Sequence, residues 1–176
     1  MRSLIQTLLT LIFVIYSINS VADNESIWRP VSINNSVLLT LPHGKVVIEL
    51  APQFAPKHVA QFRQLTQQGF YNGTKFYRVI DGFVAQAGPK EGSKKDQSVP
   101  LLNMEAEWRF NAEDLYTSVQ KNDLFAAQTG FKDSFAMAFQ TTNNQTLNRA
   151  WLTHCPGVVA MARNNEADSA SSHFYV

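Results

Sequence analysis

The stretch Lys75-Phe76-Tyr77-Arg78-Val79-Ile80-Asp81-Gly82-Phe83-Val84-Ala85-Gln86-Ala87-Gly88 decides how this chain folds. Its two halves are rich in aromatic and β-branched residues, and they flank Asp81-Gly82. An Asp-Gly pair between apolar runs is among the strongest short-range signals of a β-hairpin. We therefore predict a strand over 75–80, a two-residue turn, and a strand over 83–88.

Alternation of side chains along a strand assigns the residues of this hairpin to faces. Because the side-chain period of a strand is two, Phe76, Arg78 and Ile80 are predicted to share one face. Val84 and Gln86 share one face of the following strand by the same rule. This arrangement allows Arg78 and Gln86 to converge on one ligand.

A second hairpin is predicted before this stretch. Residues 37–41 and 45–50 are apolar runs on either side of Pro42-His43-Gly44, which is a typical turn sequence. Such a pattern favours two antiparallel strands around a tight turn.

A helix is predicted within residues 51–68. Pro56 suits the first helical position, and Gly69 suits the C-terminal cap. The apolar residues Val59, Phe62 and Leu65 recur at about one helical turn, so they indicate a buried face.

The residues after the central hairpin carry weaker patterns. Within 89–156 we expect a helix over 112–122, where a weak helical period is visible, and a strand over 131–140. Residues 157–163 form a short apolar run that is typical of a buried strand, and 174–176 begin another. With no internal repeat, the chain is predicted to form one mainly β domain with a helix.

Composition excludes several classes of protein. The 176 residues include 12 Phe, five Tyr and three Trp, which is enough apolar surface to exclude a disordered chain. A net charge of +1 without clustered Lys and Arg argues against a nucleic-acid partner. The single cysteine, Cys155, cannot close an intramolecular disulfide, and the four His lack metal-ligand spacing, so no metal is expected.

The pair His154-Cys155 suggests a Cys–His nucleophile at first sight. Adjacent residues in an extended segment point to opposite faces, so the imidazole would not reach the thiol. We therefore do not expect nucleophilic catalysis from this pair.

The hairpin stretch 76–86 resembles the signature of the cyclophilin-type peptidyl-prolyl cis-trans isomerases. Four further segments resemble this family in the family's order, namely 55–62, 69–74, 159–163 and 168–175. The resemblance covers 45–88 and 157–176, so 89–156 is interpreted as a divergent insertion. It implies a mainly β fold, a closed antiparallel β-barrel capped by helices.

The resemblance also implies a role for particular residues. Arg78 would be the catalytic group, and Phe83, Val84 and Tyr175 would line the pocket for the proline ring. Gln86 and the backbone near Ala162 would hold the peptide. The partners would be proline-containing polypeptides, with no cofactor, no metal and no nucleic acid, and the protein would act as a monomer.

The physical chemistry of the reaction supports these roles. Rotation about an X-Pro amide faces a barrier of about 18–20 kcal/mol, because the C–N bond has partial double-bond character. An apolar clamp on the ring and a hydrogen-bond donor at the twisted amide lower this barrier without a covalent step. A guanidinium supplies several fixed donors and stays charged at any working pH.

The sequence departs from the family pattern at five positions. Val84 stands where a larger Met is common, which would enlarge and stiffen the proline pocket. His173 stands where Gln is usual, so ligand binding would depend on pH unless this histidine is simply solvated. The other departures are Tyr77 for His, Ala87 for Gly and Arg163 for Asn.

The N-terminal residues predict where the protein is located. Residues 1–22 are predicted to be a signal peptide, because the apolar run 8–15 is too short for a membrane span of about 20 residues and Ser20-Val21-Ala22 suits signal peptidase. The mature protein, 23–176, would be exported to the bacterial periplasm. The alternative is a membrane anchor through residues 4–18.

At the other end, family members continue beyond the strand that holds Tyr175 with further strands and a second helix. The resemblance therefore predicts a cyclophilin-like domain that is incomplete at its C-terminus. Two alternatives to an active isomerase stay open: a non-catalytic module that binds proline-containing peptides as a chaperone, and an inactive fragment of an isomerase.

Overall fold

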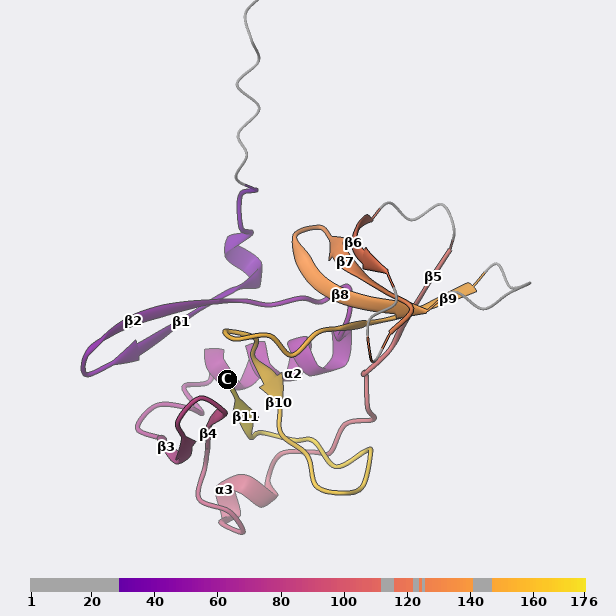
Figure 1. Cartoon of the computed structure of the whole chain (residues 1–176). Coiled ribbons are helices and arrows are strands. Elements are labelled where there is room, and N and C mark those ends of the chain that lie inside the picture. Colours follow the sequence, from indigo (N-terminus) through magenta and orange to yellow (C-terminus); the bar gives the residue numbers. More distant parts are fainter. Residues whose placement is uncertain (1–28, 112–115, 122–123, 125, 141–146) are drawn as a thin grey trace, which may run out of the picture. The chain divides into compact units, whose positions relative to one another are not determined.

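Antiparallel pairing of short β-branched and aromatic segments builds most of this protein. The computed structural model describes residues 29–111, 116–121, 124, 126–140 and 147–176. In this described part the strands form three sheets, of two, four and five strands (Figure 1). The two helices of these residues are α2 (Pro56–Gln67) and the short α3 (Lys94–Gln97).

The first sheet is the hairpin predicted for residues 37–50. After a short 3-10 helix, η1 (Ile33–Asn35), strand β1 (Ser36–Leu41) pairs with β2 (Gly44–Glu49). Leu41 lies opposite Gly44, so only Pro42 and His43 form the turn. The prediction of this hairpin is confirmed.

Helix α2 also begins and ends where the sequence predicts. Pro56 is its first residue, and Val59, Phe62 and Leu65 are its buried side chains. Gly69 adopts a φ of 68°, and the N–H of the following Phe70 donates to the Leu65 carbonyl at 2.9 Å. This pair of features ends the helix, because glycine reaches the left-handed conformation without a steric penalty.

The second sheet contains the hairpin of residues 75–88. Its order is β10 (Ala160–Met161), β11 (Phe174–Tyr175), β4 (Val84–Gly88) and β3 (Lys75–Ile80). One face packs against α2 and the first hairpin, and the buried members of this core are Ile48, Leu50, Val59, Phe62, Ala87 and Phe174. The helix therefore covers the face of the sheet that carries Ala87 and Phe174.

The turn between β3 and β4 is one residue longer than predicted. Ile80 lies opposite Val84, so Asp81, Gly82 and Phe83 all belong to the loop. Gly82 takes a φ of 66°, and the Phe83 N–H donates to the Ile80 carbonyl at 3.1 Å. A three-residue loop with glycine in the left-handed region is the next most common hairpin geometry after the two-residue turn, and it places Phe83 outside the strand.

Residues 108–152 build the third sheet, where the sequence patterns were weakest. Its order is β5 (Trp108–Asn111), β9 (Leu147–Leu152), β8 (Phe135–Gln140), β7 (Gln128–Lys132) and β6 (Thr117–Lys121). The predicted helix over 112–122 is wrong, because residues 117–121 form β6; residues 112–115 and 122 lie outside the described part. A weak helical period in a polar segment did not outweigh pairing with a neighbouring strand.

The single strand predicted over 131–140 is also wrong, because two strands meet within it. Asp133 and Ser134 have φ values of 50° and 70°, and Lys132 lies opposite Phe135. Two consecutive positive φ values are what a type I′ hairpin turn requires. Asp-Ser lacks the glycine that usually marks such a turn, so the reversal was not visible in the sequence.

The described strands do not form the closed barrel that the family resemblance predicts. Closure requires every strand to have two neighbours. In the described residues, β3 and β10 are the outer strands of the four-stranded sheet, and β1 and β2 pair only with each other. This part of the chain instead has a mainly β fold, in which separate antiparallel sheets are accompanied by two helices.

The predicted signal peptide, residues 1–22, and the alternative anchor, residues 4–18, lie outside the described residues. Within the described part, neither helix has the length and apolar character that a membrane crossing requires.

Candidate functional site

Three of the predicted site residues lie in one row across the four-stranded sheet. Arg78 on β3 lies opposite Gln86 on β4, and Gln86 lies opposite Tyr175 on β11. Directly opposed residues of antiparallel strands point to the same face, so the three side chains share a face. The Arg78 Nη1 donates a long hydrogen bond of 3.5 Å to the Gln86 Oε1. The sheet therefore brings Arg78, Gln86 and Tyr175 onto one face.

A β-bulge at Tyr77 decides which way Arg78 points. Phe76 lies opposite Ala87, whereas Arg78 lies opposite Gln86, so two steps on β3 match one step on β4. Phe76 consequently packs into the core beside Ala87, and Arg78 projects to the other face. The prediction that Phe76 shares a face with Arg78 is wrong, because alternation fails where an extra residue enters a strand.

Phe83 and Val84 lie next to Arg78 at the end of the hairpin. Phe83 is 73% exposed, and its ring centroid is 5.7 Å from the Arg78 guanidinium carbon. Val84 is two residues before Gln86 on β4 and faces the same way. One patch of the sheet is thus surrounded by the exposed ring of Phe83, the half-buried Val84 and the guanidinium of Arg78.

Tyr175 has a partner that the sequence analysis missed. Its hydroxyl lies 3.0 Å from the Nε2 of His154, and the two rings are nearly parallel at an interplanar angle of 16°. The thiol of the neighbouring Cys155 instead contacts the Thr153 hydroxyl at 3.3 Å. The imidazole is therefore directed at the site and not at the thiol. No local pattern indicates this contact, because it depends on how the chain returns from β9 to β10.

The backbone of Ala162, which the resemblance assigns to peptide binding, pairs with the segment that precedes Tyr175. Its N–H donates to the His173 carbonyl at 2.8 Å, which extends the pairing of β10 with β11. That donor is committed to the sheet. A contact from Ala162 to a bound peptide therefore has to come from its carbonyl or its methyl group.

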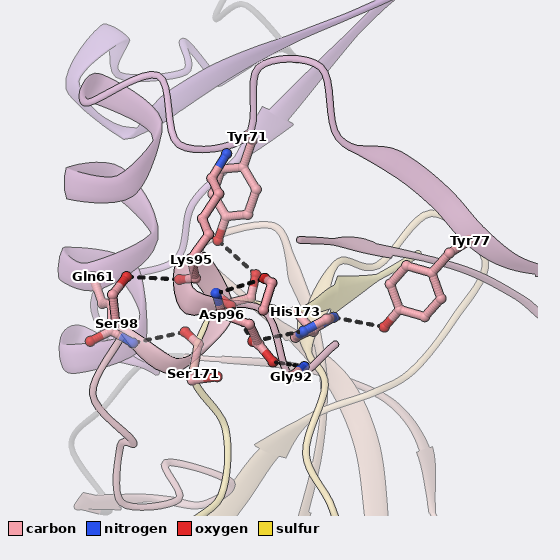
Figure 2. Close-up of polar contacts among 11 residues, drawn as sticks. Gln61, Tyr71, Tyr77, Gly92, Lys95, Asp96, Ser98, Ser171 and His173 are labelled. Atoms are coloured by element: carbon pink, nitrogen blue, oxygen red, sulfur yellow. Dashed lines mark hydrogen bonds and ion pairs between the residues drawn. The ribbon is translucent and has the colours of Figure 1, made fainter. Parts of the chain in front are cut away.

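A chain of polar contacts holds the side chain of Tyr77 at the bulge. Figure 2 shows the His173 ring between the Tyr77 hydroxyl and the Asp96 carboxylate, at 2.8 Å from Nδ1 and 3.0 Å from Nε2 respectively. The other Asp96 oxygen accepts from the Gly92 N–H at 2.9 Å. A neutral imidazole satisfies both contacts, with one nitrogen donating to the carboxylate and the other accepting from the phenol. The residue before Arg78 and the residue two positions before Tyr175 are thereby linked.

The His173 and Asp96 side chains of this chain of contacts are largely buried, whereas Tyr77 is 49% exposed. Burial raises the pKa of Tyr77, and the negative charges of Glu91 and Asp96 act in the same direction. A Cβ at Gly88 would lie 2.6 Å from the His173 Nδ1, so this position admits only glycine without a shift of the ring. The two family departures Tyr77 and His173 are thus in direct contact with each other.

The side chains of this patch offer hydrogen bonds, positive charge and aromatic surface. Among the described residues there is no group of three His, Cys, Asp or Glu side chains that could hold a metal ion. A cationic donor, an amide and aromatic surface suit the binding of a peptide and the stabilisation of a twisted amide.

The chain is similar to known proteins over most of its length. The sequence model of the family "Cyclophilin type peptidyl-prolyl cis-trans isomerase/CLD" matches residues 36–176. A probable peptidyl-prolyl cis-trans isomerase of Brucella suis is 49% identical over 63 residues, which are 36% of this chain and 32% of the relative. Peptidyl-prolyl cis-trans isomerase A of Dickeya dadantii is 30% identical over 142 residues, 80% of this chain and 52% of that protein.

A solved structure extends the comparison to the fold. The crystal structure of cyclophilin AquaCyp293 from Hirschia baltica matches with a TM-score of 0.72 and 33% sequence identity, over 85% of this chain and 59% of that chain. The chain belongs to the cyclophilin-type peptidyl-prolyl cis-trans isomerase family, so the predicted resemblance is confirmed. It spans 32% of the Brucella relative's length and 52% of the Dickeya relative's length.

Proposed function

We propose that this protein accelerates cis-trans isomerisation of X-Pro peptide bonds. The observation that carries the proposal is the row of Arg78, Gln86 and Tyr175 on one face of the four-stranded sheet. Membership of the isomerase family and the absence of any need for a covalent step support it. The substrate is a proline-containing polypeptide, and neither a cofactor nor a metal takes part.

Arg78 is the catalytic residue in this proposal. As the X-Pro amide twists, its nitrogen regains a lone pair that accepts a hydrogen bond. A guanidinium donor at that nitrogen stabilises the twisted amide more than the planar one, and only such differential binding increases the rate. The long contact from Gln86 leaves Arg78 free to exchange partners when a peptide binds.

The other residues of the patch bind and orient the peptide. Tyr175, Val84 and the exposed Phe83 supply the apolar surface against which the proline ring packs. Gln86 and the backbone at Ala162 hold the chain on either side of the ring. Immobilising the ring while the carbonyl side rotates converts binding energy into a lower barrier.

The experiment that tests the proposal compares Arg78→Ala with Lys75→Ala. Lys75 is an exposed cation on the same strand, so its removal controls for the loss of one positive charge. Isomerisation of an X-Pro peptide is followed by NMR exchange spectroscopy. Arg78→Ala should lower kcat/KM by about 100-fold, the usual effect of removing a key electrostatic donor, while Lys75→Ala keeps it. Equal rates for the two variants would show that Arg78 is not the catalytic residue.

The same experiment separates catalysis from binding alone. The non-catalytic alternative is a module that holds proline-containing peptides as a chaperone. Binding of the peptide by the unsubstituted protein without any acceleration of exchange would favour that alternative.

We also propose where the protein acts and how it is divided. Residues 1–22 serve as a signal peptide, and 23–176 form a monomeric cyclophilin-like domain that assists folding of exported proteins. Residues 89–156 are an insertion in this domain, a division that fits the confinement of the five-stranded sheet to residues 108–152. A secreted chain that begins at Asp23 in N-terminal sequencing is the expected result.

A further inference from the structure

The five-stranded sheet has two faces, which its register identifies. Met137 lies opposite Gly130 and Leu152, whereas Ala138 lies opposite Thr129 and Trp151. Because opposed residues share a face and neighbours alternate, these two rows point in opposite directions.

The face that carries Met137 is covered from within the protein. Phe54 lies between α2 and β2 in sequence, and its ring packs edge-on against Trp108 and Phe135, each at a centroid distance of 5.6 Å. Phe139 and Ala150 of the same face have no exposed surface. This face is an interior face, held by Phe54.

The opposite face carries a groove. It has a volume of about 570 Å³, and its lining includes Ala136, Ala138, Phe131, Trp151 and Val119. Val119 is 67% exposed and Phe131 45% exposed. None of the described residues that line it is an Asp, Glu, Lys or Arg. The groove therefore suits an uncharged, apolar occupant.

One end of the groove reaches the candidate active site. Its lining includes Thr153 and His154, which follow β9. His154 in turn contacts the Tyr175 hydroxyl at 3.0 Å, and Tyr175 stands in the row with Gln86 and Arg78. Figure 1 shows the connecting chain, which leaves β9 and runs to β10 at the edge of the four-stranded sheet.

We infer that this groove binds an apolar segment of the same polypeptide whose X-Pro bond lies at Arg78 and Tyr175. The inference rests on the proposed isomerase function. His154 belongs to both surfaces, so a chain that leaves the proline site past Tyr175 enters the groove directly. An unfolded polypeptide presents apolar side chains at intervals along an extended backbone, and the small lining residues Ala136 and Ala138 leave room for them.

The consequence is selection among substrates. The proline site alone distinguishes peptides only near the X-Pro bond, whereas the groove distinguishes chains by the apolar residues that flank it. Because native proteins bury such residues, the groove directs the enzyme to unfolded chains.

The test uses a proline tetrapeptide and two longer peptides that extend it on the N-terminal or the C-terminal side with alternating leucine and serine. Exchange rates are measured by NMR for the full protein. One of the two extended peptides should exceed the tetrapeptide in kcat/KM by about tenfold, which corresponds to about 1.4 kcal/mol. An extension of serine alone should give no advantage.

Substitutions in the groove then test whether the higher kcat/KM for the leucine-containing peptide depends on the groove. Val119→Asp, or Phe131→Ser if the first variant does not fold, should abolish the preference for the leucine-containing peptide. Val47→Asp is the matched control, because Val47 is 66% exposed but lies on β2. Equal turnover of short and extended peptides by the unsubstituted protein would overturn the inference, as would a preference that survives both groove variants.

Failure of the proposed function gives a different result. In that case the unsubstituted protein accelerates exchange in no peptide, including the tetrapeptide. Fluorescence anisotropy of a labelled leucine–serine peptide then tests whether the groove binds peptide at all. Binding that is lost in Val119→Asp would support an apolar peptide site in the groove, and no binding would overturn the inference.

Discussion

The four-stranded sheet β10-β11-β4-β3 and the five-stranded sheet β5-β9-β8-β7-β6 bury their side chains against different partners. The first packs on α2 and on the β1–β2 hairpin, so its core joins segments that are far apart in sequence. The second builds its small core from its own strands, with Phe54 as a contact from outside. The difference teaches that the candidate catalytic row depends on long-range packing, whereas the groove depends on a sheet formed within residues 108–152.

Truncation of one phenylalanine in each core should give the largest effect. Phe62 and Phe139 are 5% and 0% exposed, so each change to alanine should cost about 3–5 kcal/mol. Phe62→Ala should lower both the stability of the four-stranded sheet and the isomerase activity. Phe139→Ala should destabilise only the five-stranded sheet and keep activity on a short peptide. Urea unfolding and peptide exchange check both variants, and an equal loss of activity would show that the two sheets form one cooperative unit.

Alanine in place of one glycine in each sheet should have the next largest effects. A Cβ at Gly130 would lie 2.0 Å from the Thr117 carbonyl oxygen, so β6 would have to separate from β7. A Cβ at Gly88 meets the His173 ring, which can turn away only by losing its contact with Tyr77 or Asp96. We expect a cost of about 3 kcal/mol for Gly130→Ala and about 1–2 kcal/mol for Gly88→Ala, as overpacking usually gives.

Activity should respond in the opposite order to stability for these two glycines. Gly88→Ala should reduce kcat/KM on a short peptide, because it disturbs the contacts that hold the Tyr77 bulge. Gly130→Ala should leave short-peptide turnover in place. Thermal unfolding and peptide exchange measured on the same samples would contradict this expectation if Gly130→Ala were the less active variant.

Removal of the Tyr77 hydroxyl tests the anchor of the bulge. Tyr77→Phe leaves His173 without one of its two partners and should cost about 1 kcal/mol. If the anchor orients Arg78, kcat should fall with it. Tyr71→Phe is the control, because its hydroxyl donates to the Ser172 carbonyl at 2.9 Å on the core side of the same sheet. This control should lower stability but leave kcat unchanged.

The smallest change in function is expected at a contact between helix α2 and the segment that leads to the five-stranded sheet. The Glu105 carboxylate, in the segment leading to β5, accepts from the N–H groups of Lys57 and His58 and contacts the His58 Nδ1 at 2.8 Å. It caps α2 from a distance, since Ala55 at the N-cap has no side-chain acceptor. Burial opposes ionisation, but these hydrogen bonds outweigh it and lower the pKa of Glu105 below its ordinary 4.5.

The lowered pKa of Glu105 in the folded state determines how the stability of the protein changes with pH. The ionised carboxylate stabilises the fold above the unfolded-state pKa, and this stabilisation is lost as the pH falls through the folded-state value. Glu105→Gln should therefore reduce the free energy of unfolding by about 1 kcal/mol at neutral pH, as loss of a helix cap does. The difference between the two proteins should shrink in acid, which urea unfolding at several pH values will reveal.

Elements with strong local signals were predictable from the sequence. Proline and glycine mark both ends of α2, and the β1–β2 hairpin follows from two apolar runs around Pro42-His43. Strand alternation in the hairpin predicts that Arg78 and Gln86 converge, and the family resemblance adds Tyr175 to them. In each case the relevant information lies within a few residues or in a recognised motif.

Features that depend on one extra residue or on distant contacts were not predictable. Periodicity cannot reveal the bulge at Tyr77, so Phe76 was assigned to the wrong face. The turn at Asp133-Ser134 lacks glycine, and β6 has a sequence without clear alternation. His154 reaches Tyr175 only because β9 returns the chain to the four-stranded sheet.

The bulge at Tyr77 also determines which changes of chain length β3 can absorb. Phe76 and Arg78 already point to opposite faces, as neighbouring residues of a regular strand do. Loss of the single codon for Tyr77 would therefore leave the phenylalanine inside and the arginine outside. Loss of the codon for Val79 would instead make Arg78 and Ile80 neighbours, so one of the two would have to turn toward the core. Within this strand, position 77 is where the gene can lose a codon without reversing the faces of its neighbours.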